Sequence, residues 1–103
     1  MTDPVTPVIG PATQITVGGT AIVAAPAGPS GGFIVNPLLT ADQGIPAAEV
    51  LYINPTGVPA GLTANGSTFA LQPGQAWALI PGQTTQTYAN AATSGHKYSV
   101  VVY

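Results

Sequence analysis

Short runs of β-branched and aromatic residues recur along this chain, and most of them end at proline, glycine or asparagine. Residues 13–17 alternate between apolar and polar positions, and residues 20–25 resume an apolar pattern after Gly18 and Gly19. Two adjacent glycines can take the positive φ angles that a primed turn requires. The pattern therefore predicts a β-hairpin over residues 13–25.

The rest of the chain shows the same short runs, and no segment keeps helical spacing for more than one turn. Residues 38–48 are expected to be an irregular connection, with one helical turn around Leu39–Gln43. The further predicted strands are Phe33–Asn36, Glu49–Asn54, Thr68–Gln72, Ala76–Ile80, Gln86–Asn90 and His96–Tyr103. About eight short strands at this spacing are typical of an all-β, antiparallel β-sandwich or barrel.

The tripeptide Pro-Gly-Gln occurs twice, at Pro73–Gln75 and at Pro81–Gln83. Proline followed by glycine at the two central positions is typical of a type II turn. The two predicted turns flank the strand Ala76–Ile80, so we expect a tight meander there. Two copies do not define a repeat architecture.

A chain of 103 residues fits a single domain. Pro4, Pro7 and Pro11 remove backbone donors, so residues 1–12 are predicted to form an extended, proline-rich N-terminal arm. Residues 13–103 are predicted to form the β-sandwich domain. The N-terminus has neither a basic segment nor a continuous apolar run, so we expect no secretory signal and synthesis in the cytoplasm. Gly, Pro or Thr interrupts every apolar stretch, so we expect no membrane contact.

Charged residues make up only 4% of the chain, against about 25% in a typical soluble domain. They are Asp3, Asp42, Glu49 and Lys97, which give a formal net charge of −2. A single lysine is too little positive charge for a nucleic-acid-binding surface, which needs clustered lysine and arginine. Because few charges keep copies apart, we expect a protein that works in an assembly. The alternative is a monomer kept in solution by its Thr, Gln, Asn and Ser residues.

Candidate catalytic groups are sparse. His96 is the one residue that titrates near neutral pH without perturbation, and the chain has no cysteine. Ser94 or Ser99 with His96 and Asp42 is a formal nucleophile triad, but no nucleophile-elbow motif supports it. We therefore predict no enzyme activity and a surface position for His96. An enzyme would need His96 buried against a carboxylate.

Metal and cofactor sites are not predicted either. Asp3, Asp42, Glu49 and His96 are too far apart in sequence to show ligand spacing. The glycine-rich residues 28–32 lack the lysine and the helix of a phosphate loop. Calcium bound by loop carbonyls leaves no sequence signal and stays open. The glycosylation pattern Asn65–Ser67 is better explained by a tight turn.

The aromatic residues allow two interpretations. Most lie on alternating strand positions beside aliphatic residues, and Trp77 is predicted to belong to the core. A carbohydrate-binding or adhesin-like module would instead gather Tyr52, Tyr88 and Asn90 on one face. The final run Tyr98–Tyr103 is apolar on both faces, so its strand is either central in a sheet or paired across subunits. We favour burial at an interface.

The order of elements resembles a known class of proteins. It consists of an apolar strand with a tyrosine and an Asn-Pro stop, an Asn-Gly turn, the segment Thr68–Trp77, and a valine-rich last strand. Residues 30–103 in this respect resemble small β-sandwich structural proteins of tailed bacteriophages, including capsid decoration (cement) proteins. The resemblance implies oligomers, often trimers, on a capsid lattice, with an N-terminal segment that contacts the shell. Residues 1–12 carry no distinctive capsid-binding motif, so no single functional residue is transferred.

The expected function is therefore mechanical. A homo-oligomer, with a trimer favoured, would contact the major capsid protein or another virion component and stabilise the head, and the chain would be located in the virion. Extended arms and apolar strand edges would bridge neighbouring subunits. The predicted interface residues are Pro4, Val5, Pro7, Val8, Ile9, Val101 and Tyr103.

Overall fold

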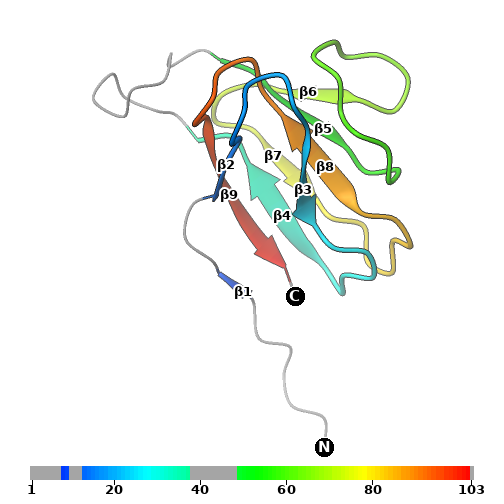
Figure 1. The fold of residues 1–103 in the computed structure, drawn as a ribbon. Coiled ribbons are helices and arrows are strands. Elements are labelled where there is room, and N and C mark those ends of the chain that lie inside the picture. The colour runs from blue at the N-terminus through cyan, green and yellow to red at the C-terminus, as the bar shows by residue number, and fades with distance from the viewer. Residues whose placement is uncertain (1–7, 10–12, 38–48, 103) are drawn as a thin grey trace, which may run out of the picture.

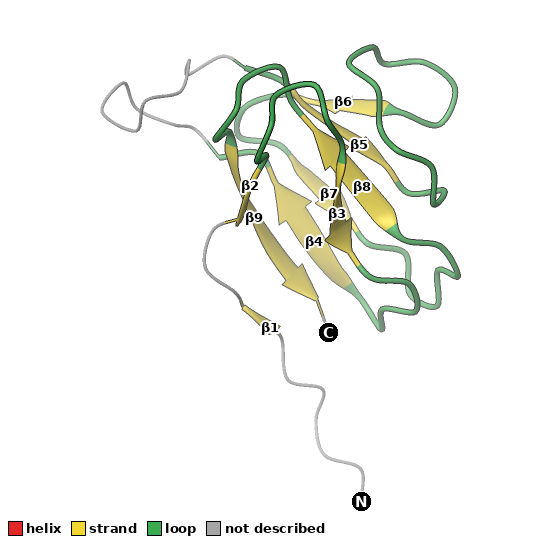
Figure 2. Cartoon of the chain, viewed as in Figure 1, coloured by secondary structure: helices red, strands yellow, loops and turns green. Residues whose placement is uncertain are grey.

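The structure is a computed structural model that describes residues 8–9, 13–37 and 49–102, and in this part of the chain two antiparallel sheets face each other (Figures 1 and 2). The first sheet has the order β1 (Val8–Ile9), β9 (Lys97–Val102), β4 (Gly32–Val35) and β7 (Ala76–Ala78), and β2 (Thr13–Gln14) also pairs with β9. The second sheet has the order β3 (Ile22–Ala25), β8 (Thr87–Asn90), β5 (Leu51–Asn54) and β6 (Phe69–Leu71). The predicted all-β antiparallel sandwich is confirmed.

The core lies between the two sheets, where alternate residues of each strand meet. Ile34 in β4 and Ile53 in β5 are fully buried, each flanked by a more exposed neighbour on at least one side. Because side chains alternate between faces along a strand, this pattern buries one face of each sheet. The buried core residues are Ile15, Ala25, Ile34, Leu51, Ile53, Leu71, Leu79, Ala89, Ala91 and Tyr98. Trp77 is half-buried and packs against this cluster, in agreement with its predicted core position.

The hairpin predicted over residues 13–25 is wrong. β2 pairs with β9 and β3 pairs with β8, so the connection through Gly18 and Gly19 passes from one sheet to the other. Backbone hydrogen bonds fix this path, because the Gly19 amide donates to Ala91 O at 2.8 Å. A Cβ on Gly18 would lie 2.1 Å from Ala92 O. Glycine is needed here for close backbone approach rather than for a primed turn.

Both Pro-Gly-Gln turns form as predicted, but the meander between them does not. Gly74 and Gly82 have φ angles of 87° and 76°, and the amides of Gln75 and Gln83 each close a turn at 3.0 Å. The strand between the turns, β7, pairs with β4 in the first sheet, whereas the neighbouring β6 and β8 belong to the second. Each turn therefore carries the chain across the sandwich.

The valine-rich strand β9 is central in its sheet, which is the alternative to the favoured burial at an interface between subunits. It pairs with β4 along Val35–Gly32 on one side and with β1 and β2 on the other. The helical turn expected around residues 39–43 lies outside the described residues.

Candidate functional site

The predicted interface residues are divided between the arm and the last strand. Val8 and Ile9 form β1 and pair with Val102 and Val101 of β9 in the same chain. Both edges of β9 at Val101 are therefore occupied within the domain, by β1 and by β4. Outside the described residues lie Pro4, Val5, Pro7 and Tyr103. The arm thus contributes a strand to its own sheet.

The outer face of the second sheet gathers two tyrosines and two asparagines. Tyr52 lies directly opposite Asn90, and Asn54 lies directly opposite Tyr88. Directly opposite residues of an antiparallel pair share a face. The tyrosines are half-buried and the asparagines are buried. The arrangement meets the condition set for the carbohydrate-binding alternative, which requires Tyr52, Tyr88 and Asn90 on one face.

The loop 55–68 lies over this face and engages both asparagine side chains. Asn90 Nδ2 donates to Ala60 O at 2.9 Å. Asn54 Nδ2 donates to Ser67 Oγ at 3.0 Å, and its Oδ1 accepts from the Thr56 amide at 3.0 Å. The two amides therefore hold the loop in place and are not free to bind a ligand.

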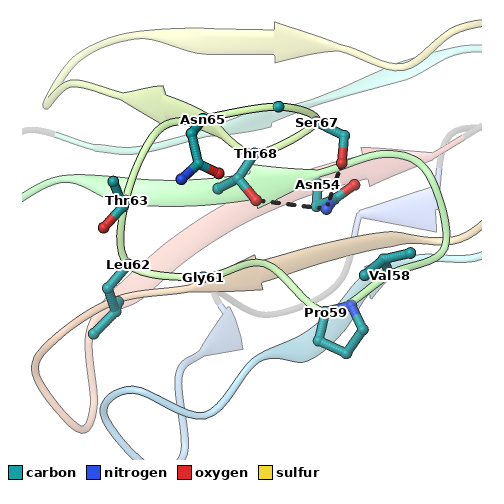
Figure 3. A pocket seen from close by; sticks show the side chains of 10 residues that line it. Asn54, Val58, Pro59, Gly61, Leu62, Thr63, Asn65, Ser67 and Thr68 are labelled. Atoms are coloured by element: carbon teal, nitrogen blue, oxygen red, sulfur yellow. Dashed lines mark hydrogen bonds between the residues drawn. The ribbon is translucent and has the colours of Figure 1, made fainter.

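A hollow of about 410 Å³ lies between this loop and Asn54 (Figure 3). Val58, Pro59 and Leu62 supply apolar lining, and Val58 is 55% exposed. The polar lining includes Thr63 and Asn65, and the residues that line the hollow are all uncharged. Such a lining is compatible with a neutral molecule that has both hydroxyl groups and apolar surface.

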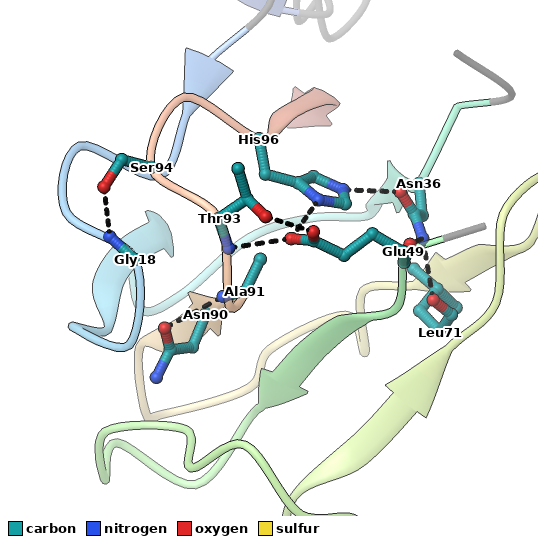
Figure 4. Close-up of polar contacts among 9 residues, drawn as sticks. All are labelled: Gly18, Asn36, Glu49, Leu71, Asn90, Ala91, Thr93, Ser94 and His96. Carbon is teal, nitrogen blue, oxygen red and sulfur yellow. Dashed lines mark hydrogen bonds and ion pairs between the residues drawn. The ribbon is translucent and has the colours of Figure 1, made fainter. Parts of the chain in front are cut away.

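A buried polar cluster connects the two sheets around His96 (Figure 4). His96 is 1% exposed; its Nε2 lies 2.8 Å from Asn36 Oδ1, and its Nδ1 lies 3.0 Å from Glu49 Oε1. The Thr93 amide donates to Glu49 Oε1 at 2.9 Å, and the Thr93 hydroxyl donates to Glu49 Oε2. The predicted surface position of His96 is therefore wrong. Burial of the ring is tolerated because these partners replace the hydrogen bonds to water that a buried imidazole loses.

Both ring nitrogens of His96 face acceptors. Asn36 Nδ2 donates to Leu71 O at 2.8 Å and to Glu49 O at 3.0 Å, so the Asn36 oxygen must point to the ring. The Glu49 carboxylate already accepts two hydrogen bonds from Thr93. The His96 ring therefore lies within ion-pair distance of the Glu49 carboxylate and contacts a second oxygen through its other nitrogen.

The Glu49 carboxyl is held in its ionised form. Burial by itself raises its pKa, but the hydrogen bonds from Thr93, the hydrogen bond from His96 and the charge of His96 together outweigh burial. The net result is a Glu49 pKa below its ordinary value of 4.5. The acidic partner of His96 is therefore an anion at neutral pH.

The enzyme alternative requires His96 buried against a carboxylate, and Glu49 supplies that carboxylate. Within the described chain, the hydrogen-bond partners of the His96 ring are Asn36 and Glu49. Ser94 Oγ instead accepts from the Gly18 amide at 2.8 Å, and Ser99 is exposed on β9. Asp42 lies outside the described residues. Nucleophilic catalysis requires the nucleophile beside its base. The arrangement joins strand ends from both sheets.

Little in the sequence pointed to this cluster. Asn36, Glu49 and His96 are separated by 13 and 47 residues along the chain. One signal was available: each residue stands at the end of a predicted strand in a chain with very few ionisable groups. No group of metal ligands is found among the described residues.

The described surface carries large apolar side chains and few charges. Glu49 and Lys97 are the charged side chains of the described residues, and Glu49 is half-buried in the cluster around His96. The exposed large hydrophobic residues are Val17, Val23, Phe33, Val58, Leu62, Phe69 and Ile80. No helix in this part of the chain is long and apolar enough to cross a membrane.

These features define the class of the protein, a two-sheet antiparallel β domain with an almost uncharged surface. No protein-family model, curated protein or solved structure matches this chain.

Proposed function

We propose that this chain is a non-catalytic structural protein of a virion, a capsid decoration protein that stabilises a bacteriophage head through contacts between copies and with the major capsid protein. The observation that carries this proposal is the exposure of large apolar side chains on an almost uncharged sandwich. Exposed apolar side chains favour contact with other proteins, and a lack of charge removes the repulsion that keeps copies apart.

The arm supports the same proposal. β1 adds an extended segment to the edge of β9 through backbone pairing of Val8 with Val102 and of Ile9 with Val101. Strand addition of this kind is a general mode of contact between proteins. In our proposal the chain uses extended segments and strand edges to bridge neighbouring subunits of a shell under internal pressure.

Purified phage particles test this proposal directly. Particles from the lysate in which the chain is produced are separated on a density gradient, and an antibody against the chain is used to label them. We expect the chain to migrate with the heads, and heads stripped of it to break at a lower temperature until the purified chain is added back. A chain that stays with the soluble proteins at the top of the gradient would refute the proposal.

A second candidate function, carbohydrate binding, rests on the outer face of the second sheet. Tyr52 and Tyr88 are half-buried there, and the neutral hollow under the loop 55–68 lies over the same face, with Asn54 in its lining. Aromatic rings with neighbouring amides and hydroxyls are the groups with which proteins bind neutral sugars. Both asparagine amides are engaged by the loop, which is why this function ranks second.

An array of neutral glycans separates the two functions. Carbohydrate binding predicts retention of specific glycans, and its loss in Tyr88→Ala. The matched control is Phe33→Ala, which removes an exposed aromatic ring from β4 in the first sheet. Glycan binding that is lost only in Tyr88→Ala would place carbohydrate recognition ahead of capsid decoration. Absence of binding to any glycan on the array would eliminate it.

A further inference from the structure

The free edge of the first sheet is formed by β7. This strand pairs with β4 through the register Ala76–Val35, Trp77–Ile34 and Ala78–Phe33, and it pairs with no second strand among the described residues. An unpaired edge presents a row of backbone donors and acceptors to any strand that approaches it.

The direction of each backbone group on β7 follows from the hydrogen bonds at its two ends. The Leu79 amide donates to Gly32 O at 2.9 Å, and Gln75 O accepts from the Asn36 amide at 3.0 Å. Hydrogen-bonded and non-hydrogen-bonded pairs alternate along an antiparallel ladder. Residues 75, 77 and 79 therefore bond to β4, and the N–H and C=O groups of Ala76 and Ala78 point away from it.

β7 is protected by its shortness, because it has only three residues, but the described strand carries no charge, proline or bulge. Natural edge strands are blocked by short length, charged side chains, prolines or bulges. β7 has the sequence Ala76-Trp77-Ala78 in regular register with β4, and both alanines are exposed. Their small side chains leave the outward-pointing backbone groups accessible.

An apolar wall adjoins this edge. Phe69 of β6 stacks on Trp77, with ring centroids 4.8 Å apart and an interplanar angle of 30°. Phe69 is 42% exposed, and Ile80, two residues after β7, is also exposed. A strand that pairs with β7 would therefore find apolar surface beside it, which backbone hydrogen bonds alone do not provide.

We propose that β7 is a docking edge for β7 of a second copy of this chain. The two strands pair antiparallel about a two-fold axis that passes between Trp77 of one copy and Trp77 of the other. The tripeptide Ala76-Trp77-Ala78 reads the same in both directions. The axis therefore pairs Ala76 of each copy with Ala78 of the other, on either side of the Trp77 pair. Each of these two pairs uses outward-pointing groups and exchanges two backbone hydrogen bonds, as in a regular antiparallel ladder.

The turns at both ends limit the contact to this short strand. Pro73-Gly74 and Pro81-Gly82 bend the chain away after β7 in both directions. A two-fold contact is also closed, since the same edge serves both copies. The pairing therefore gives a dimer, in contrast to the trimer that the bacteriophage resemblance implies. It goes beyond the proposed function, because it rests on the backbone and apolar side chains at the β7 edge and not on any contact with a capsid.

Amide exchange measured by NMR at two protein concentrations, with light scattering on the same samples, tests this pairing. We expect a dimer at the higher concentration, with exchange at the Ala76 and Ala78 amides slowed at least tenfold relative to the dilute sample. Trp77 and Leu79 amides should be protected equally at both concentrations, because they bond to β4.

Two lysine variants complete the test. Ala78→Lys adds a charge to the edge and should give a folded monomer at both concentrations. Ser99→Lys adds the same charge at an exposed position of β9, which is separated from β7 by β4, and should dimerise like the parent. Monomers of the parent, an odd-numbered assembly, or a dimer in Ala78→Lys would overturn the proposal. Such a failure leaves capsid decoration to be judged separately, on purified particles.

Discussion

At the scale of single residues, Glu49 is the centre of the polar cluster. Its carboxylate accepts from the amide and the hydroxyl of Thr93 and faces His96, and its backbone oxygen accepts from Asn36. Its side chain is only 12% exposed. When a largely enclosed polar group with several partners is changed, those partners lose their hydrogen bonds.

Replacing Glu49 by glutamine should therefore destabilise the domain. Glu49→Gln keeps the size of the side chain but removes its charge and one acceptor, and we expect a loss of about 1–3 kcal/mol in the free energy of unfolding. Urea titration followed by tryptophan fluorescence measures this loss. The control is Lys97→Gln, which removes an exposed charge next to His96 and should change stability by less than about 0.5 kcal/mol. Equal effects of the two variants would contradict the assigned role of Glu49.

The lowered pKa of Glu49 makes a second prediction at this scale. A carboxyl whose pKa is lower in the folded than in the unfolded chain stabilises the fold above its unfolded pKa. That contribution is lost as pH falls below the ordinary value of 4.5 and through the folded pKa. The difference in unfolding free energy between the parent and Glu49→Gln should therefore narrow below pH 4.5. A difference that stays constant from pH 7 to pH 3 would disprove this linkage.

At the scale of elements, close strand contact depends on particular glycines. Gly32 begins β4 with a φ of 130°, and a Cβ there would lie 2.1 Å from Val101 O in β9. β4 and β9 together form the centre of the first sheet. A side chain at Gly32 would therefore force the two strands apart at one end.

Gly32→Ala should cost about 3 kcal/mol of stability, through the clash with β9 and backbone strain. Gly82→Ala is the matched control, because Gly82 also has a positive φ, 76°, but a Cβ there meets nothing within 4 Å. The control should lose only about 1–2 kcal/mol of stability, which is the cost of placing alanine in a left-handed conformation. Thermal unfolding monitored by circular dichroism compares the two, and a control as unstable as Gly32→Ala would argue against the clash.

At the scale of the whole molecule, strands that are hydrogen-bonded neighbours are far apart in sequence. β1 and β2 pair with the last strand, and β3 pairs with β8. Loops must close before such contacts form, and this slows folding. We predict that refolding from urea, followed by Trp77 fluorescence in dilute solution, takes milliseconds to seconds. Folding within microseconds would show that local contacts dominate the transition state.

Much of the element pattern could be predicted from the sequence. The strand Leu51–Asn54 and both Pro-Gly-Gln turns lie where the runs of apolar residues and the turn residues place them. The burial of Ile34 and Ile53 also follows from the alternation. Local chemistry decides these features, because side-chain alternation and the φ angles of proline and glycine act within a few residues.

The pairing of the strands and the cluster around His96 were decided only by the tertiary structure. The alternation of apolar and polar residues shows that a strand buries one face, but it does not identify the partner strand, because every strand offers the same backbone groups. The expected hairpin and meander were therefore consistent with the sequence pattern, although neither formed. His96 reaches Asn36 and Glu49 across 60 and 47 residues, and no local spacing records such a contact. The sequence by itself determined an all-β chain with little charge and no cysteine. Packing two sheets together determined which strands became neighbours and which polar groups were buried with them.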